Sequence, residues 1–431
     1  MKLQTVRECL RPEAPPAIFR QIYPDVSTHA DRVRRFAELV ERFAAYFPGH
    51  EAGLRLFSAP GRTEVCGNHT DHQHGRVICA TIDQDIIAVA APTDDGIIRL
   101  KSEEYENEDL IDLSRLEPVE EESDHSASLI RGVAAAFAAW GYKIGGFVAY
   151  TTSHVPPGSG LSSSAAFEVL VATIMSELYN EGKVDPVTRA RAGQYAENVF
   201  FGKPSGLMDQ CGSAVGGFMT IDFENPKNPV IRALGAPLEQ GGLHVVITRA
   251  GGTHADLTPD YAAIPVEMRQ VAAALGHSVL REVDPARFYA DYARLRAAVG
   301  DRAMLRAMHF LAENERVRIA ADALEEADLD CFLEQIRTSG RSSDMLLQNV
   351  WTATSPREQP IAVATALSEH LLAGAGASRV HGGGFAGTMQ SFVPEALLAD
   401  YVAGMEAVFG KGSVLPINVR PLGACAVPLD I

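Results

Sequence analysis

A strand, a turn of small residues and a long apolar helix follow one another between residues 145 and 182, and this succession constrains the fold more than any other feature. "GGFVAYTTSHVPP" (145–157) alternates like a strand, "GSGLSSS" (158–164) is glycine and serine around one leucine, and "AAFEVLVATIMSELYNEG" (165–182) has apolar residues at helical spacing. Small residues let backbone N–H groups point into one concavity at the positive end of the helix dipole. The segment therefore predicts a phosphate-binding turn. The alternative is a serine-rich helix cap, and the GxxxxGKS or GxxxxGKT pattern of a Walker loop is absent.

Other helices and strands are indicated by periodicity and by start and stop signals. They are, in chain order, helices at 27–47, 126–141 and 185–202 and strands at 54–58 and 85–92. The helix at 185–202 has Asp185 as its predicted N-cap and Pro186 in its first turn. These elements predict a chain of mixed helices and strands.

The length of 431 residues suits two domains at about 150 residues per domain. Glycine and proline at 234–242 separate two strand-like runs. We therefore expect one domain at 1–238 and a second at 239–431.

The net charge of −17 argues against nucleic acid or an anionic membrane as the main partner, because both would repel the chain. It leaves room for a phosphate ligand held by backbone N–H groups and a divalent cation. The six cysteines are scattered without a CxxC pair, as is typical of reduced thiols in the cytosol. The N-terminus lacks the apolar core of a signal peptide, so we expect a cytoplasmic protein without a membrane span, and a monomer.

"GNHTDHQHG" (67–75) places His69, Asp71, His72 and His74 within six residues. Imidazoles and a carboxylate at this density suit a zinc site or one wall of a pocket for another ligand. A zinc site would need side chains that converge on one point, which neighbouring residues of an ordered strand-to-turn backbone rarely do.

Two further segments contain candidate residues. "QYAENVFFGKPSGLMDQCGSAVGG" (194–217) carries Glu197 in the last turn of its helix, where a carboxylate is unfavourable without a nearby cation, and Asp209 after a glycine turn. Each acid alone is more often an ordinary surface carboxylate, and Lys203 is interpreted as a loop lysine. "RVHGGGFAGT" (379–388) needs positive φ angles or a close approach of backbone to a ligand.

These motifs together resemble the signatures of the galactokinase family of GHMP kinases. "APGRTEVCGNHTDHQHG" (59–75) resembles APGRVNLIGEHTDYNGG, and "GSGLSSSAAFEV" (158–169) resembles GGGLSSSASLEV. "AENVFFGKPSGLMDQ" (196–210) resembles AEHxFxGxPCGIMDQ without a gap, and "HGGGFAGT" (381–388) resembles GGGFGGC. "ITRAGGTHADLTPDY" (247–261) is similar to a diverged form of the segment with a sugar-contacting tyrosine. The motifs stand in family order over most of the chain, which is identified as a member of this family.

The resemblance implies an α+β GHMP kinase fold of two domains with the active site in the cleft between them. The N-terminal domain would be like domain 2 of ribosomal protein S5 and the C-terminal domain ferredoxin-like. It also implies ATP-dependent phosphorylation of the anomeric hydroxyl of D-galactose, giving galactose 1-phosphate and ADP, with Mg²⁺ as cofactor.

The resemblance also implies a role for each matching residue. Asp209 would accept the proton of the anomeric hydroxyl beside the cation Arg62, and Ser163 and Glu197 would bind Mg²⁺. The residues expected around the ATP phosphates are Gly158, Ser159, Gly160, Leu161, Ser162, Ser163 and Ser164. Those expected at the sugar are Asn68, His69, Asp71, Gly206 and Tyr261. On this basis the histidine-rich stretch is interpreted as a sugar pocket rather than a zinc site.

The chain departs from the family pattern at the sugar side. Asn68 stands where the signature has Glu, Glu64 replaces Asn and His72 replaces Tyr, and residues 355–367 do not match the usual CPELDxL-like run. These departures leave another sugar (N-acetylgalactosamine, a pentose or a uronic acid) as an alternative. A sugar sensor without catalysis and a zinc hydrolase are the two rival classes. An amide can still bind a hydroxyl, but a carboxylate would form a stronger, charge-assisted hydrogen bond. Asn68→Glu is therefore expected to lower the KM for galactose or leave it little changed.

Overall fold

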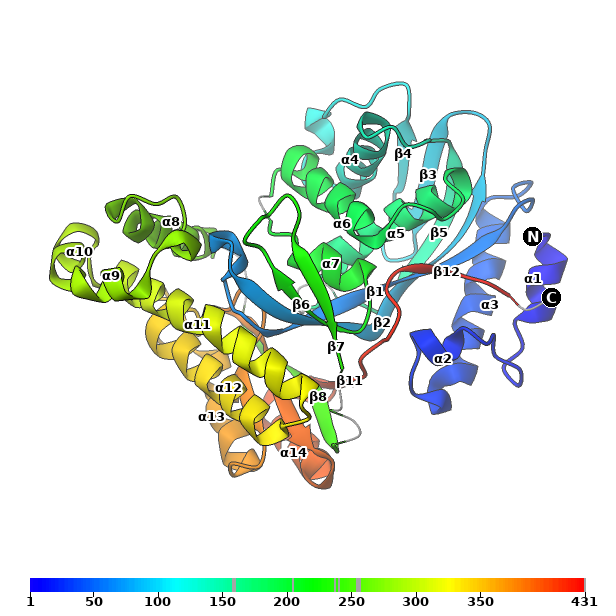
Figure 1. The fold of residues 1–431 in the computed structure, drawn as a ribbon. Coiled ribbons are helices and arrows are strands. Elements are labelled where there is room, and N and C mark those ends of the chain that lie inside the picture. Colours follow the sequence, from blue (N-terminus) through cyan, green and yellow to red (C-terminus); the bar gives the residue numbers. More distant parts are fainter. Residues whose placement is uncertain (157–159, 204, 236–237, 239–240, 253–256, 430–431) are drawn as a thin grey trace.

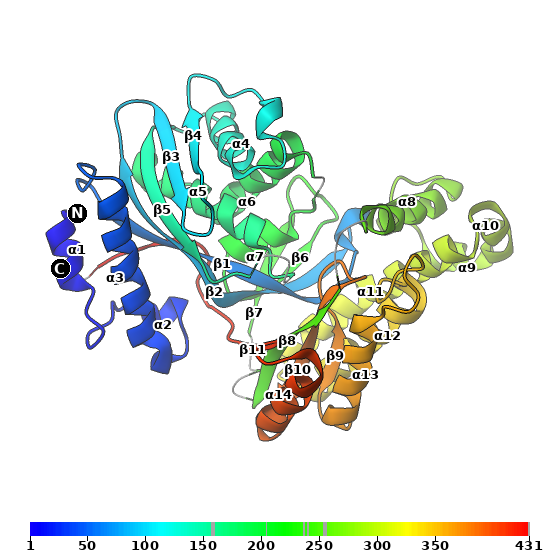
Figure 2. The ribbon, with the colours of Figure 1, turned by 180° about the vertical axis from the view of Figure 1, so that it is seen from behind.

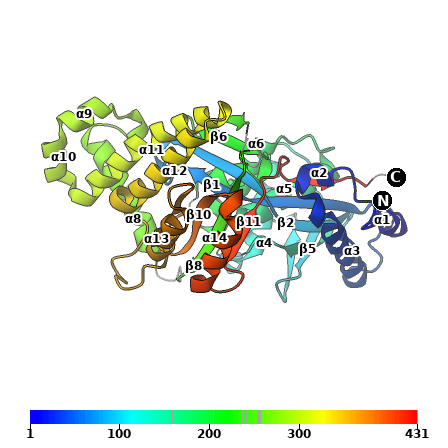
Figure 3. The same cartoon turned by 90° about the horizontal axis from the view of Figure 1, so that it is seen from below.

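The computed structural model describes residues 1–156, 160–203, 205–235, 238, 241–252 and 257–429. In this part of the chain the strands form two sheets with helices packed on them (Figure 1). Viewed from below, the molecule is elongated, with α9 (Pro285–Ala290) and α10 (Tyr292–Val299) at one end and the N-terminal helices at the other (Figure 3).

The larger sheet has the strand order β12-β1-β2-β5-β3-β4, and β6 and β7 extend from β2. Its strands are β1 (Arg55–Cys66), β2 (Arg76–Pro92), β3 (Ile97–Ser102), β4 (Glu108–Asp112), β5 (Phe147–Ser153), β6 (Phe218–Asp222), β7 (Val230–Leu234) and β12 (Cys425–Val427). Helices α4 to α7 cover one face and α1 to α3 the other (Figures 1 and 2). These helices are α1 (Leu3–Cys9), α2 (Phe19–Ile22), α3 (His29–Tyr46), α4 (Ser126–Ala139), α5 (Ser163–Tyr179), α6 (Pro186–Tyr195) and α7 (Met208–Ala214).

Residues 86–91 of strand β2 are buried on both faces, and this explains their continuous apolar sequence. Ile86 and Ala88 pack with the core under α4 to α6, whereas Ile87 and Val89 pack with α2 and α3. Successive side chains of a strand point to opposite faces, so a strand between two helical layers needs apolar residues at every position.

The smaller sheet is antiparallel with the order β11-β8-β10-β9. Its strands are β8 (Leu243–Gly251), β9 (Ala377–Val380), β10 (Gly387–Pro394) and β11 (Val414–Ile417). Helices α13 and α14 cover one face, and α11 and α12 pack on the other. The helices of this half are α8 (Thr258–Ala274), α9, α10, α11 (Asp301–Glu325), α12 (Leu329–Ser342), α13 (Pro360–Leu372) and α14 (Glu395–Phe409).

The elements expected from periodicity are confirmed with shifted ends. The expected helices correspond to α3, to α4 and to α6, which continues as a π-helical turn at Ala196–Phe201 and ends at Gly202. Asp185 is the N-cap of α6, since its side chain accepts a hydrogen bond from the backbone N–H of Thr188 at 3.0 Å. The strand and the helix expected at 145–182 are β5 and α5.

Strand β1 is longer than expected, because it passes through Ala59-Pro60-Gly61 instead of ending there. The register with β2 shifts between Pro60 and Arg62, as at a β-bulge, and a bulge tolerates a proline. A Cβ on Gly61 would lie 2.7 Å from the backbone oxygen of Leu161, so glycine permits the turn before α5 to approach this strand. Arg62 therefore extends from a strand that is buried next to that turn.

The chain passes from the larger sheet to the smaller one between β7 and β8. The expected domain boundary lies in this connection, of which residues 236–237 and 239–240 are outside the described residues. Strand β12 returns to the larger sheet and pairs with β1, so the last strand does not follow a simple division of the chain. The two-domain division at 238/239 stays a prediction.

None of the helices in the described ranges is long and apolar enough to cross a membrane.

Candidate active site

The predicted phosphate-binding turn lies between β5 and α5. Gly158 and Ser159 are outside the described residues. Gly160 has a φ of +71°, and the backbone oxygen of Leu161 accepts a hydrogen bond from the backbone N–H of Arg62 at 3.1 Å. Ser162 is the N-cap of α5 in a left-handed conformation. The second half of the turn is thus held against β1 and leads directly into the helix.

Arg62 and Asp209 form an ion pair although they are far apart in the sequence. The Nε of Arg62 donates to Oδ1 of Asp209 at 2.8 Å, and Nη1 donates to the backbone oxygen of Gly160. Ser162 donates its hydroxyl to Oδ2 of Asp209 at 2.5 Å. Burial alone would raise the pKa of Asp209, but the guanidinium of Arg62 and the hydroxyl of Ser162 hold it below its ordinary value. Asp209, whose side chain is 32% exposed, is therefore an ionised carboxylate that a ligand can reach.

His381 follows β9 of the second sheet and lies close enough to Arg62 to be influenced by its charge, a placement that was not predicted. The side chain is 2% exposed, with Nε2 3.0 Å from the hydroxyl of Thr63 and Nδ1 3.1 Å from that of Thr388. Burial and the nearby Arg62 hold the pKa of His381 well below its ordinary value. The ring is therefore a neutral neighbour of Arg62.

Glu197 is buried in a network of donors rather than lying on the surface. It is 3% exposed and accepts hydrogen bonds from Lys203 at 2.8 Å, Gln210 at 3.0 Å and Ser164 at 3.4 Å. The interpretation of Lys203 as a simple loop lysine was wrong, because its ammonium is the cation that a carboxylate in this last turn requires. Gln210 also donates to the buried Glu168 at 2.9 Å. Burial and the neighbouring Glu197 raise the pKa of Glu168 well above its ordinary value.

The residues expected to bind Mg²⁺ have suitable chemistry for it. Ser163 opens α5, and the next residue, Ser164, donates its hydroxyl to Glu197 at 3.4 Å, so the start of α5 lies next to this carboxylate. Hydroxyl and carboxylate oxygens suit a hard cation that retains water and phosphate ligands. Within the described ranges, no three or more His, Cys, Asp or Glu side chains are placed to hold a metal ion. Such a site would depend on oxygens from the nucleotide.

The histidine-rich stretch forms the connection between β1 and β2. The rings of His69 and His72 stack with centroids 5.9 Å apart, and Oδ1 of Asp71 accepts from the backbone N–H of His72 at 2.8 Å. A Cβ on Gly206 would lie 2.0 Å from Oδ2 of Asp71. Gly206 is three residues before Asp209, so the expected sugar residues Asp71 and Gly206 meet beside the start of α7.

Three of the residues expected at the sugar bind successive carbonyl groups of one glycine loop. Asn68 donates its amide to the backbone oxygen of Gly382 at 2.8 Å, and Tyr261 donates its hydroxyl to that of Gly384 at 2.8 Å. Between them, Nε2 of His69 lies 3.0 Å from the backbone oxygen of Gly383 and is its donor. The loop 382–384 from the second sheet therefore sets the orientation of residues from the connection between β1 and β2 and from α8. Residues 253–256, in the segment before Tyr261, are outside the described residues.

Asn68 has a different environment from the one expected. It is completely buried, and its amide also donates to Glu64 at 2.9 Å and accepts from Asn349 at 2.7 Å and from Ser343 at 3.4 Å. Every donor and acceptor position of the side chain is thus used inside the protein. The expected contact between Asn68 and a sugar hydroxyl does not follow from this geometry.

A buried ion pair lies behind Asn68, and sequence reasoning missed it. Arg379 on β9 donates to Glu64 on β1 at 2.8 Å, and both side chains are at most 5% exposed. Burial raises the pKa of Glu64, and the guanidiniums of Arg379 and Arg62 oppose that rise. The one available signal was a charged residue within an otherwise apolar strand pattern, which does not identify a partner 315 positions away.

Known proteins resemble this chain over most of its length. The family model "GHMP kinases N terminal domain" matches residues 128–217, and "Galactokinase galactose-binding signature" matches residues 41–92. A galactokinase of Streptomyces coelicolor is 31% identical over 371 residues, which are 85% of this chain and 89% of that protein.

Solved structures with a similar fold include a galactokinase and a mevalonate kinase. Galactokinase of Lactococcus lactis in complex with galactose matches with a TM-score of 0.77 at 24% identity, over 90% of this chain and 99% of that chain. Mevalonate kinase of Methanococcus jannaschii matches with a TM-score of 0.60 at 13% identity, over 85% and 99% of the two chains. The α+β fold seen here is thus the GHMP kinase fold.

Proposed function

We propose that this chain, which belongs to the galactokinase family of GHMP kinases, transfers the γ-phosphoryl group of ATP to the anomeric hydroxyl of D-galactose. The products are galactose 1-phosphate and ADP. The observation that carries the proposal is the ionised Asp209, held by Arg62 and Ser162 between the phosphate-binding turn and the Asp71–Gly206 contact.

In this proposal Asp209 accepts the proton of the anomeric hydroxyl as the oxygen attacks phosphorus. Phosphoryl transfer depends mainly on positioning and on neutralising charge, so a carboxylate with a low pKa is sufficient as a base. Arg62 keeps Asp209 ionised and adds positive charge beside the attacking oxygen. Residues 158–164 surround the ATP phosphates, and His69, Asp71, Gly206 and Tyr261 surround the sugar.

We assign Ser163 and Glu197 to Mg²⁺, which when bound neutralises charge on the ATP phosphates. The oxygen donors described above support this assignment. Zinc present at one equivalent in protein purified without added metal, and retained after mild chelation, would contradict it and support a metal site at the histidine-rich stretch instead.

We also propose a cytoplasmic monomer with functional units at 1–238 and 239–431 that enclose the site between them. The six cysteines are free thiols, as in a reducing compartment. Light scattering of the purified chain measures the oligomeric state, and a dimer would contradict this part of the proposal.

A panel of sugars with ATP and Mg²⁺, read out as ADP release, tests the proposed function. We expect D-galactose to be preferred and the product to be a sugar 1-phosphate by phosphorus NMR. A strong preference for N-acetylgalactosamine, a pentose or a uronic acid would reject galactose and retain the kinase. Galactose binding without ADP release from any sugar would instead indicate a sensor.

Replacing Arg62 by Met is expected to move the acid limb of kcat/KM to higher pH by on the order of one unit. Asp209 must be ionised to act, so activity is lost as the pH falls through its pKa. In the native chain this pKa lies below its ordinary value, and without the guanidinium burial raises it. The measurement is a pH profile of kcat/KM for both proteins that extends down to about pH 3, because the acid limb of the native protein lies below the ordinary carboxylate value, with Arg62→Lys as the control that retains the positive charge. Parallel profiles for native and Met proteins would show that Arg62 does not set the ionisation of Asp209.

Replacing Gly206 by Ala is expected to raise the KM for the sugar by roughly 10- to 100-fold, the range for losing one charge-assisted hydrogen bond. The new Cβ would lie 2.0 Å from Oδ2 of Asp71 and would displace that carboxylate. Steady-state kinetics with both substrates should show a much smaller change in the KM for ATP. Gly235→Ala is the matched control, because a Cβ there meets no atom within 4 Å. An unchanged sugar KM in Gly206→Ala would remove Asp71 from the sugar site.

A further inference from the structure

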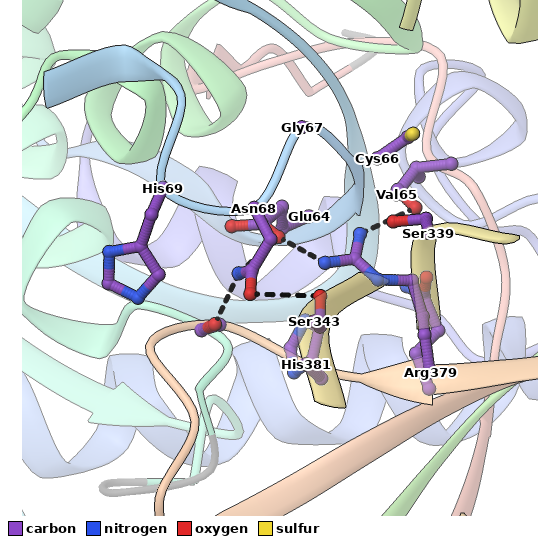
Figure 4. Close-up of polar contacts among 12 residues, drawn as sticks. Glu64, Val65, Cys66, Gly67, Asn68, His69, Ser339, Ser343, Arg379 and His381 are labelled. Carbon is purple, nitrogen blue, oxygen red and sulfur yellow. Dashed lines mark hydrogen bonds and ion pairs between the residues drawn. The ribbon is translucent and has the colours of Figure 1, made fainter. Parts of the chain in front are cut away.

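Two departures from the family signature compensate each other in space. The signature has Asn and Glu where this chain has Glu64 and Asn68, so an amide and a carboxylate have exchanged positions four residues apart. The two side chains are in direct contact, because the amide of Asn68 donates to Oε1 of Glu64 at 2.9 Å (Figure 4). The exchange therefore retains one carboxylate and one amide in the same place.

The carboxylate of Glu64 forms an ion pair with the guanidinium of Arg379. Glu64 is 4% exposed and Arg379 is fully buried, and their polar atoms are 2.8 Å apart. Arg379 also donates to the backbone oxygen of Val65 at 2.9 Å, so it joins β9 to β1 (Figure 4). A buried charge without a partner is costly, and the removal of either partner leaves the other uncompensated.

The position of the amide requires a group that both donates and accepts. Asn68 donates to Glu64 and to the backbone oxygen of Gly382, and it accepts from Asn349 and Ser343. A carboxylate at residue 68 cannot donate, so it would face the carboxylate of Glu64 and the carbonyl of Gly382 with no proton between them. This geometry therefore argues against the expectation that Asn68→Glu lowers the KM for galactose or leaves it little changed in a chain that still carries Glu64.

We propose that Glu64, Asn68 and Arg379 act together as positioning residues, with Asn68 holding the segment 67–71 on the glycine loop 382–384 without touching the sugar. The backbone oxygen of Asn68 is also bound, at 2.9 Å from Nε2 of the buried His309 on α11. His69 follows directly and binds the next carbonyl of the loop, and in Figure 4 its ring points away from the Glu64–Arg379 pair. The sugar-facing groups are then His69 and Asp71, whose orientation depends on Asn68. The inference rests on the proposed function only where it names the sugar.

The first test is a double-mutant cycle on the full chain with Glu64→Asn, Asn68→Glu and the double variant, measured by thermal unfolding without substrate. We expect each single variant to unfold at a lower temperature than the native chain. The double variant should recover part of this loss, because the two carboxylates no longer face each other and one carboxylate, one amide and one guanidinium are again present, while the hydrogen bond to the backbone oxygen of Gly382 stays lost. Asn107→Glu, the same change in the exposed turn between β3 and β4, should leave the unfolding temperature unchanged.

Two results of the cycle would overturn the proposal. One is a double variant whose loss equals the sum of the two single losses, which would show that the exchanges are independent. The other is an Asn68→Glu protein that unfolds at the native temperature and has a lower KM for galactose, which would place residue 68 at the sugar. The cycle needs no catalysis, so it tests the exchange even if the native chain phosphorylates no galactose and the proposed function fails.

The second test separates positioning from direct contact and uses Asn68→Ala, which adds no charge. Its KM is measured for galactose and for the 2-, 3-, 4- and 6-deoxy sugars. A positioning residue raises the KM of every sugar by the same factor, which we expect to be about tenfold, with the KM for ATP changed less than about twofold. If Asn68 instead bound one hydroxyl, the sugar that lacks this hydroxyl would have the same KM with the native and Ala proteins, and that result would refute the proposal.

Discussion

Asp209→Asn is expected to reduce turnover at least ~10²-fold, the effect of removing a positioned proton acceptor. The carboxylate accepts from Arg62 and Ser162 and lies at the start of α7, and an amide of the same shape leaves Arg62 without its counter-charge. ATP binding should remain largely intact, because the expected phosphate contacts come from the turn before α5. The measurement pairs single-turnover phosphoryl transfer with nucleotide binding by calorimetry.

Asp94→Asn is the matched control, since this carboxylate lies exposed in the turn between β2 and β3. It should have native activity. Near-native turnover in a folded Asp209→Asn protein would remove Asp209 from the proposed role while leaving membership of the family untouched.

Asp85→Asn is expected to lower the free energy of unfolding by about 3–5 kcal/mol, the typical cost of leaving buried charges without a partner. Asp85 on β2 has no exposed side-chain surface and accepts from Tyr23 at 2.6 Å, Ser58 at 2.5 Å and Arg35 at 2.5 Å. Arg420, also fully buried, lies 3.5 Å away. This one carboxylate thus joins the N-terminal helices and the C-terminal segment to the strands beside Arg62. Chemical denaturation measures the loss.

The effect should depend on pH with a defined sign. Burial alone would raise the pKa of Asp85, but the guanidiniums of Arg35, Arg32 and Arg420 reverse this and depress it strongly. The stabilisation is therefore fully present above the unfolded-state pKa of about 3.9 and is lost as the pH falls further, so native and variant proteins should converge in acid. Asp31→Asn, which breaks an exposed ion pair on α3, should change stability by less than about 1 kcal/mol. A similarly small loss in Asp85→Asn would show that the network contributes little.

Much of the fold was predictable because its determinants are local. The apolar spacing of 165–182 and the small residues before it specify a helix that follows a tight turn, and α5 begins at Ser163. Asp185 and Pro186 mark the start of α6 by hydrogen-bonding rules that involve only nearby residues. The continuation of β1 through Pro60 was not predictable, because it depends on a register shift against β2.

The candidate site also has features that the sequence predicts and features that it does not. The sequence by itself determined which groups are present and in which motifs: Arg62, Asp209, Glu197, the serine turn and the glycine loop are all recognisable from short segments. Their chemistry follows from residue type. Each motif could therefore be interpreted before any contact between the motifs was known.

Only the tertiary structure decided what these groups do to one another. In the folded chain Lys203 forms an ion pair with Glu197. Asn68 is buried and hydrogen-bonded within the protein rather than available to a sugar hydroxyl. Glu64 and Arg379 meet from two different sheets. The physical reason is that burial and partner geometry set the state and availability of a polar side chain, and for Asn68 and Glu64 these depend on residues up to 315 positions away. Helix and strand patterns, by contrast, depend on neighbours along the chain.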